Sequence, residues 1–193
     1  MVKITPTQTQ APLHRVGGNL ALDFANTVSW RGTRNETDHI ATTAGLYRWA
    51  AESRLLDGAS SAPDDDKCLM TAHILRAGIR SAMESILAGR DVAEDRAALI
   101  GILRGALGSA EMVGSPAQFR FRDPCDLIVG PVVLAAVDLL RDERLSRLKM
   151  CPRDECHWLF LDLTKNRSRR WCDMAACGNR AKVELHRHRH QPG

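Results

Sequence analysis

The sequence predicts a mainly α-helical protein, in which a helix-rich N-terminal domain with a short β element precedes a small C-terminal module of β-hairpin and helix. Three observations lead to this prediction. Ala, Leu and Arg are abundant and only 5% of residues are aromatic, which favours helices. Apolar residues recur every three or four positions in several segments. Four of the six cysteines lie within residues 151–180, close enough to hold a small module together.

Two short helices are expected near the N-terminus. Asn19 can cap the first helix, which we place over residues 20–30. A polar loop follows it. Thr42 or Thr43 can cap the second helix, and Gly58 stands just past its end. The apolar face of this second helix consists of Leu46, Trp49 and Ala50.

Three polar residues of the first helix share one face. Asp23, Asn26 and Thr27 are spaced i, i+3 and i+4, which places them together on a helix. They could line a polar pocket for a small-molecule effector. Equally, their side chains could tie neighbouring loops together by hydrogen bonds.

Two longer helices follow. The first begins in a Ser/Pro/Asp segment that puts three carboxylates at the positive end of the helix dipole, and it ends at Gly89. The second also begins with acidic residues and ends at Gly108. Their apolar faces consist of Ala72, Leu75, Ile79, Met83 and Ile86 in the first and Leu99, Ile102, Leu103 and Ala106 in the second.

The segment after these helices contains the short β element and a core helix. Residues 117–122 alternate between polar and apolar side chains, which predicts a strand or hairpin arm. The core helix should begin at Pro131 and run through Leu140, and it can continue through residues 143–150. We expect the helix-rich domain to cover residues 13–148. No Gly/Ser linker follows it, so the C-terminal module should pack against it.

The composition also constrains the compartment. The most apolar run, residues 127–140, is interrupted by polar and helix-breaking residues and is too short to span a membrane. The N-terminus lacks the features of a secretory signal, so we expect a cytoplasmic protein whose thiols stay reduced. Cys68 and Cys125 are then expected to be small buried hydrophobic residues.

The C-terminal module, residues 149–190, carries the clearest chemical pattern. Cys151 and Cys156 form one Cys-x4-Cys pair, and Cys172 and Cys177 form another. Two such pairs separated by a hairpin-sized insert can place four sulfurs around one Zn2+ ion. Four thiolates leave no open position on the metal, so the zinc would be structural. An iron–sulfur cluster could use the same sulfurs.

The residues around the cysteines predict a fold like a treble clef. Segments 157–163 and 169–172 suit two short antiparallel strands, and residues 164–168 have turn composition. A helix should follow the second pair, with Cys177 in its first turn and Gly178 allowing a close approach to the metal. We expect the terminal residues 186–190 to form a disordered, weakly basic tail.

Longer motifs reveal a family resemblance. The stretch "CPRDECHWLFLDLTKNRSRRWCDMAACGNRAKVELHRHR" resembles the CGNR zinc-finger family, named for the tetrad at residues 177–180. "LALDFANTV" and "GLYRWAAESRLL" are similar to the helix-rich domain that precedes this finger in bacterial proteins called putative stress-induced transcription regulators. The resemblance implies a bacterial regulator. It also implies the zinc ligands Cys151, Cys156, Cys172 and Cys177.

The positive charge of the chain is concentrated beside these cysteines. Residues 151–193 contain 9 of the 27 Lys and Arg residues but only 5 of the 23 acidic ones, which accounts for the whole net charge of +4. Guanidinium groups match phosphate oxygens, so the finger can contact DNA. There are three alternatives to DNA contact. These side chains could simply be solvated, they could contact a protein, or some of the arginines could only offset the negative charge of the zinc thiolates. The candidate DNA contacts are Lys165, Arg167, Arg169, Arg170, Arg180, Lys182, Arg187 and Arg189.

Two tryptophans of the module have two interpretations as well. Trp158 and Trp171 could stack on bases, but in so small a module they are better explained as hairpin core.

The sequence therefore favours a DNA-binding transcription regulator. Its helical domain would sense a small-molecule effector or form a homodimer. The second hypothesis is a protein-interaction module in which the finger is a structural cap. A third hypothesis is a helical domain that binds a small molecule or catalyses a reaction. No catalytic motif supports an enzyme, and His14, His39 and His73 have no spacing typical of a catalytic pair.

Overall fold

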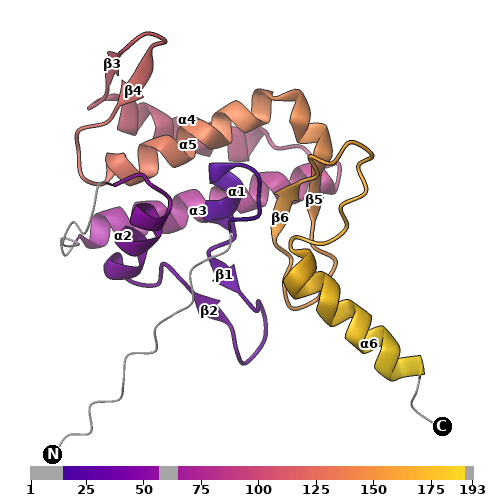
Figure 1. The fold of residues 1–193 in the computed structure, drawn as a ribbon. Coiled ribbons are helices and arrows are strands. Elements are labelled where there is room, and N and C mark those ends of the chain that lie inside the picture. Colours follow the sequence, from indigo (N-terminus) through magenta and orange to yellow (C-terminus); the bar gives the residue numbers. More distant parts are fainter. Residues whose placement is uncertain (1–14, 57–64, 190–193) are drawn as a thin grey trace, which may run out of the picture.

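The computed structural model describes residues 15–56 and 65–189, apart from the side chains of Leu185, His188 and Arg189. His14, Gly58 and His190 lie outside the described residues. The chain forms a body of five helices, with the C-terminal module at one end of it (Figure 1). The body helices are α1 (Leu20–Ala25), α2 (Thr43–Glu52), α3 (Asp66–Leu87), α4 (Ala93–Leu107) and α5 (Asp126–Arg141).

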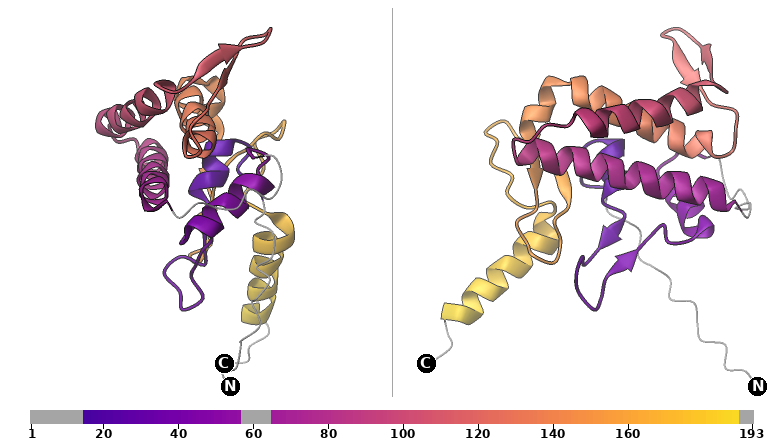
Figure 2. Two further views of the ribbon diagram at one scale, coloured as in Figure 1. Left: turned by 90° about the vertical axis from the view of Figure 1, so that its left-hand side faces the viewer. Right: turned by 180° about the vertical axis from the view of Figure 1, so that it is seen from behind.

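The short helix α1 lies at the centre of the body. It contacts both α3 and α5, which run alongside α4 as the long rods of the fold (Figure 2). All of its apolar residues after Leu20 are completely buried: Ala21, Leu22, Phe24 and Ala25. Phe24 packs edge-on against Trp49 of α2, with 4.8 Å between ring centroids. The core thus forms around α1, the helix that also carries Asp23 of the predicted polar cluster.

Helices α2, α3 and α4 confirm that the predicted helices exist, although α2 ends at Glu52 and not just before Gly58 as expected. The Thr42 side chain accepts a hydrogen bond from the Gly45 amide at 3.1 Å, which caps α2. The Asp65 side chain accepts one from the Cys68 amide at 3.0 Å, which caps α3. Helix α4 ends where Gly108 follows it.

The helix expected over residues 20–30 is shorter than predicted. It ends at Ala25, and Val28–Ser29 forms strand β1, which pairs antiparallel with β2 (Thr37–Asp38). The Thr27 side chain donates to the Phe24 carbonyl at 2.8 Å, while the Thr27 carbonyl accepts from the His39 amide at 2.8 Å. These tertiary bonds stop the helix and start the ribbon.

The core helix α5 begins earlier and ends earlier than predicted. It starts at Asp126, because the Asp123 carboxylate accepts the amide of Cys125 at 2.9 Å before the first turn. Pro131 lies inside the helix. The helix ends at Arg141, where Asp142 caps a 3-10 turn (Glu143–Arg147). Residues 148–150 then form a strand, so the expected continuation of the helix through 143–150 is wrong.

The predicted β element is a hairpin at the far end of the body. Strand β3 (Glu111–Val113) pairs antiparallel with β4 (Gln118–Arg120), in agreement with the alternation over residues 117–122. All three residues of β4 are exposed, and the hairpin projects from α4 and α5 (Figure 1). Among the described residues no helix is long and apolar enough to cross a membrane.

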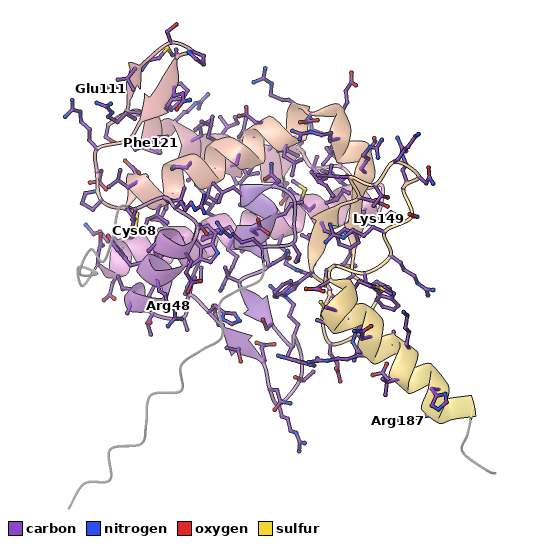
Figure 3. The ribbon with its side chains drawn as sticks, viewed as in Figure 1. Arg48, Cys68, Glu111, Phe121, Lys149 and Arg187 are labelled. Carbon is purple, nitrogen blue, oxygen red and sulfur yellow. A yellow bond between two sulfur atoms is a disulfide. The ribbon has the colours of Figure 1, made fainter. Side chains whose placement is uncertain are left out.

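The expectation that Cys68 and Cys125 are separate reduced thiols is wrong. The structure joins them in a disulfide between the first turn of α3 and the residue before α5, with 5.3 Å between the Cα atoms (Figure 3). This separation lies within the usual range for a disulfide. The sequence did not reveal the pair, because packing of α3 against α5 brings together residues 57 positions apart.

The disulfide predicts a specific thiol count. Protein purified without reductant, denatured with a chelator present, should expose four thiols to a thiol reagent rather than six. Reduction should also lower the free energy of unfolding by about 2–4 kcal/mol, because the bridge restricts the unfolded chain. A count of six before reduction would contradict the bridge.

Candidate metal centre

The first cysteine pair lies in the loop of a β-hairpin. Strand β5 (Leu148–Met150) pairs antiparallel with β6 (Leu159–Leu161), and Cys151 and Cys156 belong to the connection between them. The Cys151 amide donates to the Trp158 carbonyl at 2.8 Å, and the Cys156 amide donates to the Arg153 carbonyl at 3.0 Å. These bonds turn both side chains toward one point.

The pairing of β6 differs from the prediction. We expected segment 169–172 as its partner, but β5, which precedes the first cysteine, takes that place. Residues 169–172 are held differently, since the Arg169 side chain donates to the carbonyls of Trp171 and Cys172. Residues 164–168 form turns, as their composition predicts.

The second pair lies at the start of the C-terminal helix. Asp173 caps a π-helical turn (Met174–Gly178) that carries Cys177, and α6 (Asn179–Arg189) follows directly. The prediction of a helix beginning at the last cysteine is confirmed. Gly178 is tightly packed: a Cβ atom there would lie 2.3 Å from the Met174 sulfur. Gly178 therefore allows the close approach of Met174, whereas we had expected it to allow a close approach to the metal.

The four sulfurs converge. All four ligand atoms lie within 4.8 Å of one another. The sulfurs of Cys156 and Cys172 are 3.5 Å apart, and those of Cys172 and Cys177 are 3.6 Å apart. A tetrahedron with Zn–S bonds of about 2.3 Å has edges of about 3.8 Å, so this donor set fits one zinc ion.

The four thiols shift one another's pKa values. Hydrogen bonds from Cys156 and Cys172 lower the pKa of Cys151, whereas hydrogen bonds to Cys151 raise the pKa of Cys156 and Cys172. Without a cation the sulfurs share protons, because four thiolates this close repel one another. A zinc ion would be held by all four as thiolates, and it would supply structural cross-linking.

A buried carboxylate organises the loop between the pairs, and sequence reasoning missed it. Asp162 is completely buried. Its side chain accepts hydrogen bonds from Lys149 Nζ at 2.6 Å, from the Arg169 amide at 2.9 Å and from the Thr164 amide at 3.1 Å. Burial alone would raise the pKa of Asp162, but its hydrogen bonds, led by that from Lys149, lower it. The Asp-x-Thr turn motif at residues 162–164 can be recognised in the sequence, whereas the pairing of Asp162 with Lys149 cannot.

Arg169 is committed to the interior of the module. Its guanidinium donates to backbone carbonyls of Val16, Leu161, Trp171 and Cys172, and it lies 4.4 Å from the centroid of the Phe160 ring. Its donors already have acceptors within the chain, so Arg169 serves the fold, and the expectation that it also contacts DNA stays a prediction.

Six of the other expected cations lie on the surface of the module, and the side chain of Arg189 is outside the described part of the chain. Arg180 stacks on Trp30 at 4.1 Å from the ring centroid, and Arg170 stacks on Trp171 at 5.2 Å. Helix α6 extends away from the body as far as Arg189, so the tail expected to be disordered is helical up to that residue (Figure 3). The exposed set is Lys165, Arg167, Arg170, Arg180, Lys182 and Arg187.

Most of the acidic side chains of the module form ion pairs with cations of the same module. Arg153 donates to both Glu155 and Glu184 at 3.0 Å, which braces α6 against the first cysteine loop. Asp162 is paired with Lys149. Three of the five acidic residues of the module are thus paired within it, although Glu155 and Glu184 remain about half exposed.

Asn26, the residue that follows α1, joins the body to the module, while Asp23 and Thr27 bond to other segments. The Asn26 amide donates to the Leu159 carbonyl and its oxygen accepts from the Leu159 amide, both at 2.8 Å and both buried. Asp23 accepts from the Gly17 amide at 2.8 Å, and burial raises its pKa to about 6. Thr27 accepts from Arg76 at 3.2 Å. These contacts agree with the alternative in which the three residues tie neighbouring segments together; an effector pocket at them stays a prediction.

Apolar contacts reinforce this junction. Leu148, Leu159 and Leu161 of the hairpin belong to the same core as the body helices. Trp158 is buried beside the cysteines and donates from its indole nitrogen to the Val28 carbonyl at 2.9 Å. The interpretation of Trp158 as core is thus confirmed, and Trp171 is half-buried against the same cluster.

Comparison with protein families agrees with this geometry. The family model described as "ABATE: Putative stress-induced transcription regulator" matches residues 18–143. The chain belongs to the ABATE family. The CGNR zinc-finger model matches residues 147–190 of this ABATE protein, which include all four cysteines. A search of the curated proteins finds no match. Together with the convergent sulfurs, the finger match establishes one structural zinc site.

Replacing one ligand should destroy the zinc site. Cys172→Ser should bind less than one tenth of the wild-type zinc and unfold the finger, because metal binding supplies on the order of 10 kcal/mol to such modules. Metal analysis and circular dichroism measure these effects. The matched control, Cys68→Ala with Cys125→Ala, should keep one zinc per chain; equal zinc loss in both proteins would contradict the assignment.

The Asn26 junction predicts a stability effect far from the metal. Asn26→Ala leaves a buried amide and a buried carbonyl of Leu159 unpaired, so unfolding in urea should become easier by about 2–4 kcal/mol. Asn35→Ala, in the exposed β1–β2 loop, should change stability by less than about 0.5 kcal/mol. If the two variants were equally stable, Asn26 would not join the two parts.

Proposed function

We propose that this ABATE protein is a DNA-binding transcription regulator whose zinc finger contacts duplex DNA through its exposed cations. The family description supports the regulatory role. The observation that carries the proposed DNA contact is the separation of charge in the finger. Its acidic groups are largely paired internally, while the six surface cations form no ion pair among the described residues.

Two elements present these cations differently. Lys165 and Arg167 lie on the loop that Asp162 holds in place, so they form a preorganised pair for phosphate groups. Arg180, Lys182 and Arg187 lie on α6, which projects from the body in both views of Figure 2. A single projecting helix fits the major groove, which is about 12 Å wide. We assign backbone contact to the loop and groove contact to the helix.

Salt-dependent binding tests this proposal. Zinc-loaded wild type should bind a labelled duplex in fluorescence anisotropy, with an affinity that falls steeply between 50 mM and 200 mM salt, as about one counterion is released per phosphate contact. Lys165→Glu with Arg167→Glu should weaken binding at least about tenfold at low salt and reduce the salt slope by about 2. The double variant leaves Arg169 and the buried Asp162 network unchanged.

The control carries the same charge change on the body. Arg96→Glu with Arg104→Glu alters two exposed arginines of α4 and should leave the salt slope unchanged. The proposal fails if zinc-loaded wild type shows no salt-sensitive binding, or if the α4 variant loses as much affinity as the loop variant.

A specific observation keeps the protein-interaction alternative in view. The finger exposes Leu163, Met174 and Val183, each about half accessible. Such residues can dock a protein partner. If the loop variant binds DNA as well as the wild type, this apolar surface becomes the better-supported interface.

Other expectations about the regulator stay predictions. These are homodimer formation by the helical domain, sensing of an effector, and a cytoplasmic location. Neither matched family is described as an enzyme.

A further inference from the structure

A second polar site lies outside the zinc centre and the cationic finger surface. It is a hollow of about 600 Å³ between α3, the β1–β2 ribbon and the first cysteine loop. This volume falls within the range of small-molecule sites, about 300–1,000 Å³. Its polar lining residues are Arg31, His73, Arg76, Arg80, Ser81, Glu84 and His157.

One stripe of α3 forms the floor of the hollow. His73, Arg76 and Arg80 follow one another at spacings of three and four residues, so they share a helix face. Arg31 approaches from the loop after β1, and His157 approaches from the cysteine loop. Residues from three parts of the chain therefore converge, which the sequence alone could not show.

The lining is positively charged. It contains three arginines and one acid, Glu84, whose carboxylate contacts Arg80 Nε at 2.6 Å. Asp38 neutralises Arg76 with bonds of 2.6 and 2.7 Å. Even with Asp38 included, the arginines outnumber the acids, and Arg31 forms no ion pair among the described residues. Burial, followed by the closeness of Arg80 and Arg76, lowers the pKa of Arg31.

Two guanidinium groups at the hollow have unused donors. Arg31 Nε and Arg80 Nη1 are buried and have no hydrogen-bond acceptor. Buried donors in folded proteins are nearly always paired, because an unpaired one costs free energy. The remaining Arg80 nitrogens are occupied by Glu84 and by the His157 carbonyl at 3.0 Å. A bound oxyanion would supply acceptors for both donors.

We propose that the hollow binds a small molecule bearing an oxyanion, a phosphate or a carboxylate, with Arg31 and Arg80 as its main contacts. Arg76, which is paired with Asp38, lines the hollow beside them. The histidines and Ser81 add donors and acceptors at the edge. The site differs from the cluster of Asp23, Asn26 and Thr27, which is bonded within the chain.

The burial of the arginines favours a small ligand over a DNA backbone. The side chains of Arg76 and Arg80 are only 13% and 12% exposed, whereas phosphates of a duplex are reached by protruding cations. Arg80 also links α3 to the His157 carbonyl, next to a zinc ligand. A ligand held here would therefore contact the body and the finger together. Its role as an effector rests on the proposed regulatory function, but its binding does not.

Calorimetric titration in the absence of DNA tests the site. Sodium phosphate and sodium succinate serve as probes of the two oxyanion classes, with chloride used to keep the ionic strength constant. Zinc-loaded wild type should bind at least one of them saturably at a single site. Arg31→Met should weaken binding about tenfold, which corresponds to the loss of one charge-assisted contact. Arg34→Met, an exposed residue of the same loop, should bind as the wild type does.

The choice of Arg31 protects the test from misfolding, since Arg31 forms no hydrogen bond among the described residues. A heat-denaturation midpoint within about 2 °C of wild type would verify that the variant is folded. The proposal is overturned if the wild type binds neither probe saturably up to 10 mM, or if Arg34→Met weakens binding as much as Arg31→Met. It is also overturned if Arg31→Met impairs only duplex DNA binding, which would assign the hollow to a backbone phosphate.

Discussion

One ion shared by four thiolates is the constraint on which the C-terminal module, residues 149–190, depends. The finger has a small apolar cluster of its own, formed by the cysteines with Trp158 and Phe160. Such a module is too small to fold by burial alone. The metal joins the hairpin loop to the start of α6, so the cationic side chains of α6 take their position from that junction.

The finger is also part of the body in a physical sense. Its hairpin contributes leucines to the main core, and Asn26 pairs with the backbone of Leu159 as another strand would. Trp30 and Arg180 add a contact at the surface. The body and the finger are therefore linked by packed and hydrogen-bonded groups.

Charge is sorted within the module by burial. Acids that are buried or paired, such as Asp162 and Glu184, hold the loop and α6 in place, while unpaired cations remain on the surface. Arg153 and Arg169 show that an arginine beside a zinc site can serve the fold alone. The arginines of the module thus fall into two groups, those that stabilise the fold and those that remain on the surface. Only the contacts of each side chain show to which group it belongs.

The sequence by itself determined the features that depend on local spacing. Helical periodicity and caps located α2, α3 and α4, and the two Cys-x4-Cys pairs identified the metal ligands, because neighbours along the chain set both patterns. It did not determine where α1 and α5 end, which strand pairs with β6, or that Cys68 meets Cys125. These features depend on contacts between residues far apart in the chain. The pairs of Asp162 with Lys149 and of Arg80 with His157 are contacts of the same kind. Only the tertiary structure decides such contacts, because packing of the whole core selects which distant residues meet.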